Sequence, residues 1–502
     1  MSTKDGLRGY GQDQALIGRR SFLKTCAALG IVGMATGPLA GCMACSGSRS
    51  GSGGVRDVAL AYDLVVVGAG GAGLTAAVSA KEHGVGSVVI FEKEGFNGGN
   101  TNFAASGMNA SETKFQRARG IADTNKLFVE DTFLSGKENA DIKLVEHLCH
   151  NSADAIEWLD GHGITLDRVA QMAGARAKRC HCPTDGSAIG KTLVPGLVGI
   201  ASKVTASIRS LSRVSEVIMK DGMASGVKLV DGTVCNAKAV VLATGGFGAN
   251  LNMVASFRQD LRDYVSTNVQ GTTGDGLAMA ALVGAQLIDM DHIQVYPTVN
   301  QKDGTLIVEA LRDNGGILVN VKGERFVDEM AGRDEVSAAE LEQVGGCAYV
   351  LYDQRIFDAV REAAVYEERG LTLKANTLEE LAQGIGADPF TLQATVDAYN
   401  AVSVDGIADT YGRTQDLTTF YDGPFYANRV APGIHHCMGG IRIDAQCRAL
   451  TKDGAAIPGL FAAGETTGGI HGANRLGGNA ICDIVVNGRT AGEQAARHIL
   501  GL

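Results

Sequence analysis

At 502 residues the chain is longer than one hydrophobic core usually serves, so we expect two domains or one domain with a large insertion. Its 68 glycines and 5% aromatic residues favour an α/β protein with many tight turns over an all-β or disordered chain. The formal net charge of -10 is not concentrated in a basic patch, which argues against a nucleic-acid partner.

The N-terminal segment is predicted to be a targeting signal. Residues 17–24 read IGRRSFLK, which is typical of a twin-arginine export signal, and an ordinary basic signal region is the alternative. The apolar run over 25–41 is too short to span a membrane. It ends in LAGC, which resembles a lipobox with Cys42 as the acylated residue, unless a plain signal cleavage occurs nearby.

We therefore expect a lipoprotein signal over residues 1–42 and a flexible, Ser/Gly-rich linker over residues 43–60. The lipid on Cys42 would anchor the protein at the periplasmic or extracytoplasmic face of the cell membrane.

The chain has 11 cysteines, and their spacing does not suggest a disulfide framework. Mostly free thiols are expected, because a cofactor-containing protein exported by this route folds first in the reducing cytoplasm. Residues 180–182 read CHC, but two thiols without a second pair are a weak metal signal, so no metal is predicted. The chain contains no CxxCH motif for haem attachment.

A β-α-β unit follows the linker. Residues 64–67 read LVVV and predict a buried strand, a glycine turn comes next, and small and apolar residues over 74–83 predict a helix. A second strand is expected over 87–91. Strands are also expected at 239–243, before Thr244-Gly245-Gly246, and at 459–463, before Gly464-Glu465, and we expect all these strands in one sheet.

The glycine turn carries a dinucleotide-binding fingerprint. Gly68, Gly70 and Gly73 satisfy GxGxxG, with Gly71 and Ala72 between them. The pattern is weak alone, but here it follows a strand and opens a helix, whose N-terminus attracts the charge of a pyrophosphate. A glycine-rich turn without a ligand is the alternative.

Glu92 lies about 20 residues beyond the fingerprint, where an acid accepts hydrogen bonds from the ribose hydroxyls of a dinucleotide, and Lys93 follows it. This unit suits NAD and FAD equally, so the choice depends on later motifs. A long flavin cofactor requires motifs spread over most of the chain, as are Gly98, Gly99, Asn100, Thr101, Thr244, Gly245, Gly246, Asp275, Gly464 and Glu465. We expect noncovalent FAD. Direct reduction by NADH is not expected, because there is no second fingerprint.

Six motifs together resemble the flavoprotein subunit of the fumarate reductase/succinate dehydrogenase family, and most closely its soluble flavocytochrome c type. The resemblance begins near residue 61 and is carried by GAGGAG, GGN, GDG, RFVDEMAGRD, PGIHHCMGG and HGANRLGGNA. It implies an α/β fold, with a Rossmann-like FAD-binding domain formed by residues 61–290 and 411–502. Residues 291–410 carry more charge, contain helical stretches such as 378–383 and lack strands followed by glycine, so they are predicted to form an inserted second domain, an α+β capping domain.

The resemblance also assigns residues to the substrate and the flavin. Arg475 and His435 would clamp a substrate carboxylate, with a structural His and a surface Arg as the alternative. His436 would contact the flavin through its backbone. The end of the last motif adds further cofactor-binding positions, namely Gly478, Asn479, Ala480 and Ile481.

Arg333 matches the position of the family's proton donor. Free guanidinium titrates above about 12, so this role requires a carbanion as acceptor and a relay that restores the proton. Glu309 and Arg312, at spacing i and i+3, match the family's relay. The alternative is an ion pair of Arg333 with Asp334 or Glu335.

Two departures from the family pattern concern the substrate, and a core position for Tyr296 is the alternative for the first. Tyr296 stands where fumarate reductases carry His, and Val308 replaces a hydroxyl residue before the relay Glu. Both lost groups would bind the far carboxylate of fumarate, so a phenol and an isopropyl group favour an uncharged or aromatic substrate tail. Cys182 replaces an Arg that is usual in the family.

The sequence therefore predicts transfer of hydride from reduced FAD to the C=C bond of a small α,β-unsaturated carboxylate, an aryl- or alkyl-acrylate rather than fumarate. A separate cytochrome c or quinol-linked protein would supply the electrons of this terminal respiratory reductase. The alternatives are a fumarate or urocanate reductase proper, a dehydrogenase or oxidase running the reverse reaction, and a flavin electron carrier without a substrate pocket.

Overall fold

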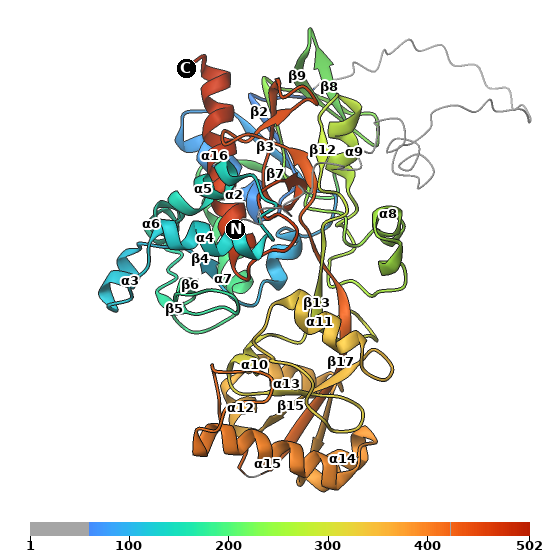
Figure 1. Cartoon of the computed structure of the whole chain (residues 1–502). Coiled ribbons are helices and arrows are strands. Elements are labelled where there is room, and N and C mark those ends of the chain that lie inside the picture. The colour runs from blue at the N-terminus through green and yellow to red at the C-terminus, as the bar shows by residue number, and fades with distance from the viewer. Residues whose placement is uncertain (1–59, 422) are drawn as a thin grey trace, which may run out of the picture.

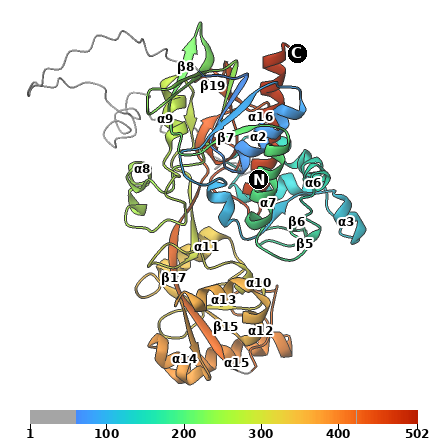
Figure 2. The same cartoon turned by 180° about the vertical axis from the view of Figure 1, so that it is seen from behind.

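The computed structural model describes residues 60–421 and 423–502, so the export signal and Cys42 lie outside the described residues. Figures 1 and 2 show two lobes. The blue N-terminal part and the red C-terminal part of the described chain meet in one lobe, and the yellow and orange middle forms the other. Each lobe has its own hydrophobic core, as the length of the chain suggests.

A six-stranded sheet forms the centre of the first lobe. Five strands are parallel and the edge strand β19 is antiparallel to its neighbour. The strand order is β19 (Arg448–Leu450), β20 (Ala456–Ala462), β11 (Ala239–Leu242), β2 (Leu64–Val67), β3 (Val88–Phe91) and β7 (Ser207–Arg209). The expectation that strands far apart in the sequence share one sheet is confirmed.

The inner strands of this sheet are apolar on both faces because helices cover them. All four residues of β2 are buried, which explains its unbroken LVVV run. Helix α2 (Gly71–Glu82) packs against the long C-terminal helix α16 (Asn479–Leu500). Helix α2 begins at Gly71 rather than at residue 74, since the last glycines of the fingerprint already form its first turn.

Three smaller sheets complete the first lobe. One contains β1 (Leu60–Ala61), β10 (Val234–Asn236), β9 (Met223–Leu229) and β8 (Val214–Lys220). The others are β12 (Leu287–Ile288), β18 (Gly440–Arg442) and β21 (Thr467–Gly468), and β4 (Met108–Asn109), β6 (Cys180–Cys182) and β5 (Arg168–Ala170).

The remaining helices of this lobe surround the central sheet (Figure 2). They are η1 (Gly99–Phe103), α3 (Lys114–Ala118), α4 (Asn125–Ser135), α5 (Ile142–His150), α6 (Ser152–Gly161), α7 (Ile189–Lys203), α8 (Leu251–Phe257), η2 (Gln259–Leu261), α9 (Asp275–Leu282) and η3 (Gly464–Thr466).

The second lobe is the capping domain, a five-stranded sheet with helices. Its strands are β13 (Ile293–Val299), β17 (Phe425–Cys437), β15 (Ala348–Asp353), β14 (Ile317–Val319) and β16 (Thr372–Ala375). Its helices are α10 (Ala310–Asp313), α11 (Arg333–Leu341), α12 (Gln354–Ala359), α13 (Arg361–Glu368), α14 (Leu378–Ile385) and α15 (Pro389–Asp405).

Strand β17 connects the two lobes. Its first half pairs with β15 and β16 in the cap, and its second half pairs with β13 and ends beside the first lobe (Figure 1). The hydrophobic core of the cap includes Phe420, Phe425 and Val430. The cap therefore extends beyond the boundary expected at residue 410, because the strand that closes its sheet comes later in the chain.

Within the described residues, no helix combines the length and apolar character needed to cross a membrane.

Candidate active site

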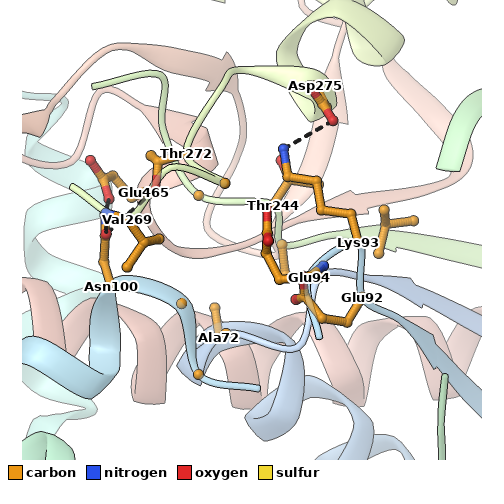
Figure 3. A pocket seen from close by; sticks show the side chains of 18 of the residues that line it. Ala72, Glu92, Lys93, Glu94, Asn100, Thr244, Val269, Thr272, Asp275 and Glu465 are labelled. Carbon is orange, nitrogen blue, oxygen red and sulfur yellow. Dashed lines mark hydrogen bonds and ion pairs between the residues drawn. The ribbon is translucent and has the colours of Figure 1, made fainter. Parts of the chain in front are cut away.

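A cleft in the first lobe runs along the carboxyl ends of β2, β3 and β11, where the fingerprint turn lies (Figure 3). Ligands of open α/β sheets bind at this edge. Its lining includes most of the predicted cofactor residues, namely Gly68, Gly70, Gly71, Ala72, Glu92, Lys93, Gly98, Gly99, Asn100, Thr101, Thr244, Gly245, Asp275 and Glu465.

The fingerprint glycines fit a backbone that must turn tightly beside a ligand. A Cβ at Gly73 would lie 1.9 Å from the Gly68 carbonyl oxygen, and a Cβ at Gly68 would lie 2.4 Å from the Ala243 carbonyl oxygen. Gly68 also has a φ of +103°, which disfavours other residues. Only glycine at these two positions leaves room for the turn, so the cleft suits a dinucleotide pyrophosphate at the start of α2.

Glu92 is fixed by the turn that it faces. One carboxylate oxygen accepts a hydrogen bond from the backbone N–H of Ala69 at 2.8 Å, and the other accepts one from Glu94 N–H at 2.8 Å. Each oxygen has a second lone pair, and Glu92 lines the cleft. This placement suits an acceptor for ribose hydroxyls.

Lys93 and Asp275 form an ion pair of 3.1 Å at the side of the cleft, drawn in Figure 3. Arg213, which the sequence did not single out, pairs with the same Asp275 at 3.0 Å. Burial would raise the pKa of Asp275, but the charges of Lys93 and Arg213 lower it. The carboxylate is thus ionised and holds two cations at the cleft.

Not every predicted cofactor residue lines a cavity. Gly73, Gly246 and Gly464 are close-approach positions, where a Cβ would lie within 3 Å of a neighbouring residue. Asn479 is buried and bonds through its side chain to Asn109 and Thr132. These four residues lie behind the residues that line the cavities and pack against them. The sequence missed Val269, Thr272 and Ile484, ordinary residues that line the cleft without a motif.

A second cavity adjoins the cofactor cleft and lies between the two lobes. The two share Asn100, Thr101, Glu465 and Ile484. Five of the six predicted catalytic residues meet here, namely Tyr296, Glu309, Arg333, His435 and Arg475, together with the predicted cofactor residues His436, Gly478, Ala480 and Ile481. The apolar part of the wall comes from η1 and the chain after it, and from Leu306.

Arg333 is the first residue of α11, which presents its guanidinium to this cavity. It pairs with Glu309 at 3.0 Å, and not with Asp334, which pairs with Lys137 at 2.9 Å. Burial would raise the pKa of Glu309, but the charges of Arg333 and Arg312 lower it to about 2. The carboxylate is therefore ionised between two arginines.

Arg312 lies behind Glu309 rather than in the cavity wall. Its Nη2 is 3.4 Å from the Glu309 carboxylate, and its Nη1 donates to the Glu329 carbonyl at 2.7 Å. The side chain is 1% exposed, and its Nε has no hydrogen-bond partner among the described residues. The predicted set of Arg333, Glu309 and Arg312 is thus contiguous, with Glu309 in the middle.

Gln294 links the two arginines that line the cavity, a role that the sequence analysis missed. Its side-chain carbonyl oxygen accepts from Arg333 at 3.2 Å and from Arg475 at 3.1 Å. Burial and then the charge of Arg333 lower the pKa of Arg475 to about 9. Arg475 remains charged at neutral pH, and its buried Nε has no partner in the described chain, as expected of a group that binds an anion.

His435 and Tyr296 lie beside Arg333. The Thr267 hydroxyl is 2.9 Å from His435 Nδ1, which leaves Nε2 for a ligand. Burial and the charges of Arg333 and Arg475 lower the pKa of His435 well below its ordinary value, so the ring is neutral. The Tyr296 ring lies 5.2 Å from the His435 ring and 4.8 Å from the Arg333 guanidinium carbon.

Val308 does not line this cavity. Its side chain belongs to the core of the cap, and its N–H donates to the Tyr366 hydroxyl at 3.2 Å. Leu306, two residues earlier, lines the cavity instead. The apolar character expected at this end of the site is present, but a different residue provides it.

The chain is similar to known flavoproteins in sequence. The FAD binding domain family matches residues 63–481. A fumarate reductase (cytochrome) of Shewanella frigidimarina is 42% identical over 442 residues, which cover 87% of this chain and 77% of the relative. The chain belongs to the fumarate reductase/succinate dehydrogenase flavoprotein family. The FAD cofactor and the oxidoreductase class expected from the sequence are therefore confirmed for this family member.

Two further relatives of this flavoprotein are informative. The NADH:fumarate oxidoreductase of Klebsiella pneumoniae (strain 342) is 42% identical over 88% of this chain, which spans only 48% of that relative. The structure of the open conformation of a flavocytochrome c3 fumarate reductase matches with a TM-score of 0.76 and 39% identity, covering 88% of this chain and 79% of the other. The expected α/β fold is confirmed.

Proposed function

We propose that the protein reduces the C=C bond of a small α,β-unsaturated carboxylate with an apolar or aryl tail, in preference to fumarate. FAD, bound noncovalently, would supply the hydride, and a separate cytochrome c or quinol-linked protein would supply its electrons. The observation that carries the proposal is the cavity beside the cofactor cleft, in which Arg475, His435 and Arg333 converge.

Arg475 and His435 bind and orient the substrate carboxylate. Arg475 has a buried Nε without a partner in the described structure, and the neutral His435 has Nε2 available once Thr267 holds Nδ1. Gln294 fixes the Arg475 guanidinium by accepting from its Nη2. A positioned guanidinium holds a carboxylate in one orientation, which keeps the double bond close to the cofactor cleft.

Arg333 delivers the proton to the α-carbon of the substrate. Burial would lower its pKa, but the charge of Glu309 raises it, so Arg333 stays protonated until a strong base such as a developing carbanion is present. Glu309 accepts a proton from Arg312 and passes it to Arg333, since it contacts both guanidinium groups. The proton that Arg312 gives up is restored from solvent.

The tail of the substrate lies against an apolar wall. The cavity lining contains two arginines, and one of them is neutralised by Glu309, which leaves Arg475 for a carboxylate. Burial, followed by the charge of Glu309, raises the pKa of Tyr296 to about 12, so the phenol is neutral. A second buried carboxylate without a cation costs several kcal/mol, at least roughly 3 by analogy with broken buried ion pairs, whereas an aryl tail gains from Tyr296 and Leu306.

Arg333→Ala tests the proposed proton donor. The variant should keep FAD and substrate binding and lose about 10²- to 10⁴-fold in kcat, because a positioned acid is removed while the carboxylate clamp remains. Turnover at saturating substrate, with reduced viologen as electron donor, measures the effect. Arg355→Ala is the control, because the Arg355 side chain is exposed on the surface of the cap. Equal turnover of Arg333→Ala and the wild type would rule out the assigned role.

We also propose export by the twin-arginine route and anchoring through Cys42, supported by the motifs at residues 17–24 and 39–42. Cys42→Ala should move the protein from the membrane fraction to the soluble fraction, and Arg19→Lys with Arg20→Lys should block export. Fractionation with an antibody against the chain measures both, with Cys45→Ala as the control. A Cys42→Ala protein that stays with membranes would show that lipid on Cys42 is not the anchor.

A further inference from the structure

Cys180 and Cys182 place two thiols next to each other behind Gly107, a residue of the substrate cavity wall. They occupy positions i and i+2 of β6, so both side chains point to the same face of the strand. A Cβ built on Gly107 would lie 2.9 Å from each of the two sulfur atoms, and Gly107 lines the substrate cavity. The Cys182 thiol donates a hydrogen bond to the backbone carbonyl oxygen of Cys180 at 3.6 Å.

Thiol exchange begins with attack by a thiolate, and the environments of the two cysteines favour the thiolate at one of them. Cys182 is half-buried, and the Cys180 thiol together with the charge of Arg168 lowers its pKa. Cys180 is buried, and its pKa is raised by Cys182 and by burial. Burial also raises the pKa of five other cysteines, namely Cys149, Cys235, Cys437, Cys447 and Cys482. Cys182 therefore has the strongest thiolate character of these seven.

The residue between the cysteines is not available as a metal ligand. His181 Nε2 is 2.7 Å from the Thr113 hydroxyl, and Nδ1 is 2.8 Å from the Arg179 carbonyl oxygen. Burial lowers the pKa of His181 to about 4, so the ring is neutral. No group of three or more His, Cys, Asp or Glu within the described chain is arranged to hold a metal ion. The thiols therefore form a pair of their own.

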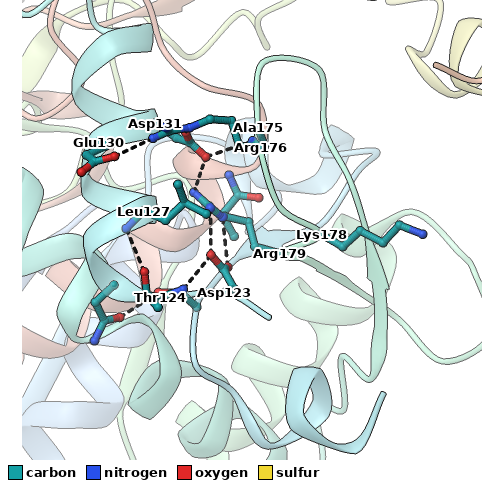
Figure 4. Close-up of polar contacts among 12 residues, drawn as sticks. Asp123, Thr124, Leu127, Glu130, Asp131, Ala175, Arg176, Lys178 and Arg179 are labelled. Atoms are coloured by element: carbon teal, nitrogen blue, oxygen red, sulfur yellow. Dashed lines mark hydrogen bonds and ion pairs between the residues drawn. The ribbon is translucent and has the colours of Figure 1, made fainter. Parts of the chain in front are cut away.

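A buried ion-pair network fixes the start of this strand (Figure 4). Arg179, fully buried and immediately before Cys180, pairs with Asp123 at 2.9 Å and with Asp131 at 2.9 Å. The same Asp131 contacts Arg176. This network anchors the residue that immediately precedes β6.

We propose that Cys180 and Cys182 are a redox-active dithiol, a modification site for small disulfide oxidants beside the substrate cavity. The Cys182 thiolate attacks one sulfur of the oxidant, forms a mixed disulfide and releases the first thiol. The Cys180 thiol then gives up its proton and attacks Cys182 Sγ, which forms the Cys180–Cys182 disulfide and releases the second thiol. Two electrons pass from the protein to the oxidant.

The disulfide is expected to be reversible. Positions i and i+2 of a strand are about 6.4 to 6.8 Å apart between Cα atoms, from a rise of about 3.2 to 3.4 Å per residue. Disulfides span Cα separations of about 4.4 to 6.8 Å and most lie at about 5.5 to 6 Å, so an unshortened strand would hold the disulfide near the long end of the range and closure favours a slightly shorter strand. Strained disulfides of this kind are easily reduced, which is the property of labile and regulatory bonds.

Formation of the Cys180–Cys182 disulfide would affect the loop at the start of α16 through strand β4. Asn109 pairs with Cys180 across the sheet, and its side-chain amide donates to the Gly477 carbonyl at 2.6 Å and to Asn479 Oδ1 at 2.7 Å. The adjoining Gly478, Ala480 and Ile481 line the cavity. A shortened β6 therefore displaces the loop at the start of α16, and we expect oxidation to slow turnover.

Thiol chemistry on the FAD-loaded protein tests the proposal without reference to any substrate. The probe is 2,2′-dithiodipyridine, which releases a coloured thiopyridone at each exchange step. The wild type should release two thiopyridones for this pair, and the peptide containing both cysteines should lose the mass of two hydrogens and regain it with dithiothreitol. Cys180→Ser should release one thiopyridone and keep a pyridyl adduct on Cys182.

Two controls accompany the test. Cys182→Ser should not react at this strand in the native protein, because Cys180 is buried, and Cys347→Ser should behave like the wild type; flavin absorbance shows that each variant is folded. A wild-type protein that keeps the adduct on Cys182 beside an unreacted Cys180 would overturn the proposal. So would a Cys182 that does not react at all. Neither result depends on the proposed enoate reductase activity.

Discussion

Gln294 shows how single residues hold the site together. Arg333 and Arg475 carry like charges and face one cavity, and the Gln294 carbonyl oxygen lies within 3.2 Å of a donor on each. Its amide nitrogen donates to Asn474 Oδ1 and to the Arg475 carbonyl, so the side chain cannot rotate freely. The neutral amide thus separates the proton donor from the carboxylate clamp without cancelling either charge.

Glu340 is a buried acid in an unfavourable environment. It lies on α11 two turns after Arg333, is fully buried, and neither carboxylate oxygen has a well-formed hydrogen bond within the described structure. Burial raises its pKa well above the ordinary value, while Arg312 and the Ala348 N–H lower it in part. This carboxyl therefore costs stability whenever it must ionise.

Glu340→Leu should stabilise the protein by about 1 to 3 kcal/mol near pH 8, because an unsatisfied buried polar group is removed. In the folded state the raised pKa means that the wild type binds a proton that the unfolded chain releases above about 4.3. Wild-type stability therefore falls as pH rises above that value, and the gain from the variant should be smaller at pH 5 than at pH 8. Denaturant unfolding at both values checks this.

The control is Glu342→Leu, the same change at an exposed position just past the helix, which should have little effect at either pH. A gain for Glu340→Leu that is larger at pH 5 than at pH 8 would contradict the assignment of a neutral, buried acid.

At the scale of elements, the packing of α16 on α2 positions the cofactor. A Cβ at Gly488 would lie 2.8 Å from the Ala72 carbonyl oxygen, and a Cβ at Gly492 would lie 2.2 Å from the Ala76 carbonyl oxygen. The two glycines, four residues apart, let the helices approach along their backbones. The start of α2 faces the predicted pyrophosphate position, and the start of α16 carries the loop beside the substrate cavity.

Gly492→Ala should therefore destabilise the protein by about 1 to 3 kcal/mol, since the added methyl overpacks a helix contact. Because α2 must move away, the occupancy of FAD should also fall. Thermal unfolding measures the first effect, and flavin released by acid precipitation measures the second and shows whether the cofactor is noncovalent. Arg497→Ala, at an exposed position of the same helix, is the control. Unchanged stability and flavin content in Gly492→Ala would show that the helices do not need this close approach.

At the scale of the whole molecule, residues of both the cap and the FAD-binding lobe line the substrate cavity. The lobes are linked by β13 and β17, by hydrogen bonds of Gln294 with Asn474 and Arg475, and by two ion pairs between exposed side chains, Lys137 with Asp334 at 2.9 Å and Arg361 with Asp185 at 3.9 Å. Such surface pairs contribute about 0 to 1 kcal/mol each. These two ion pairs therefore contribute little to holding the cap against the first lobe.

The sequence predicts the local parts of this architecture well. The β-α-β unit follows from LVVV, the glycine fingerprint and Glu92, because apolar runs and glycine turns act over short distances. The resemblance to the family identified Arg333, Glu309 and Arg475, which the structure brings together although they are far apart in the chain. Their roles in catalysis remain predictions.

The rest depends on contacts between distant segments. The cap extends past residue 410 because β17 pairs with strands of the cap, and nothing in its own sequence reveals those partners. Leu306 lines the cavity in place of Val308 because a short irregular segment turns one side chain into the cap core. Gln294 has no motif of its own, and its role appears only when both arginines are placed.

The central claim is that reduced FAD in this protein is reoxidised by an enoate with an apolar tail. The most direct measurement is the anaerobic rate at which cinnamate-like acrylates, alkyl acrylates, urocanate and fumarate oxidise the reduced protein, with Tyr296→His as the comparison variant. We predict a higher kcat/KM for the aryl and alkyl acrylates than for fumarate in the wild type, and a relative gain for fumarate in Tyr296→His. Fumarate as the best wild-type substrate would contradict the proposed pocket, and failure of every enoate to reoxidise the flavin would contradict the reductase itself.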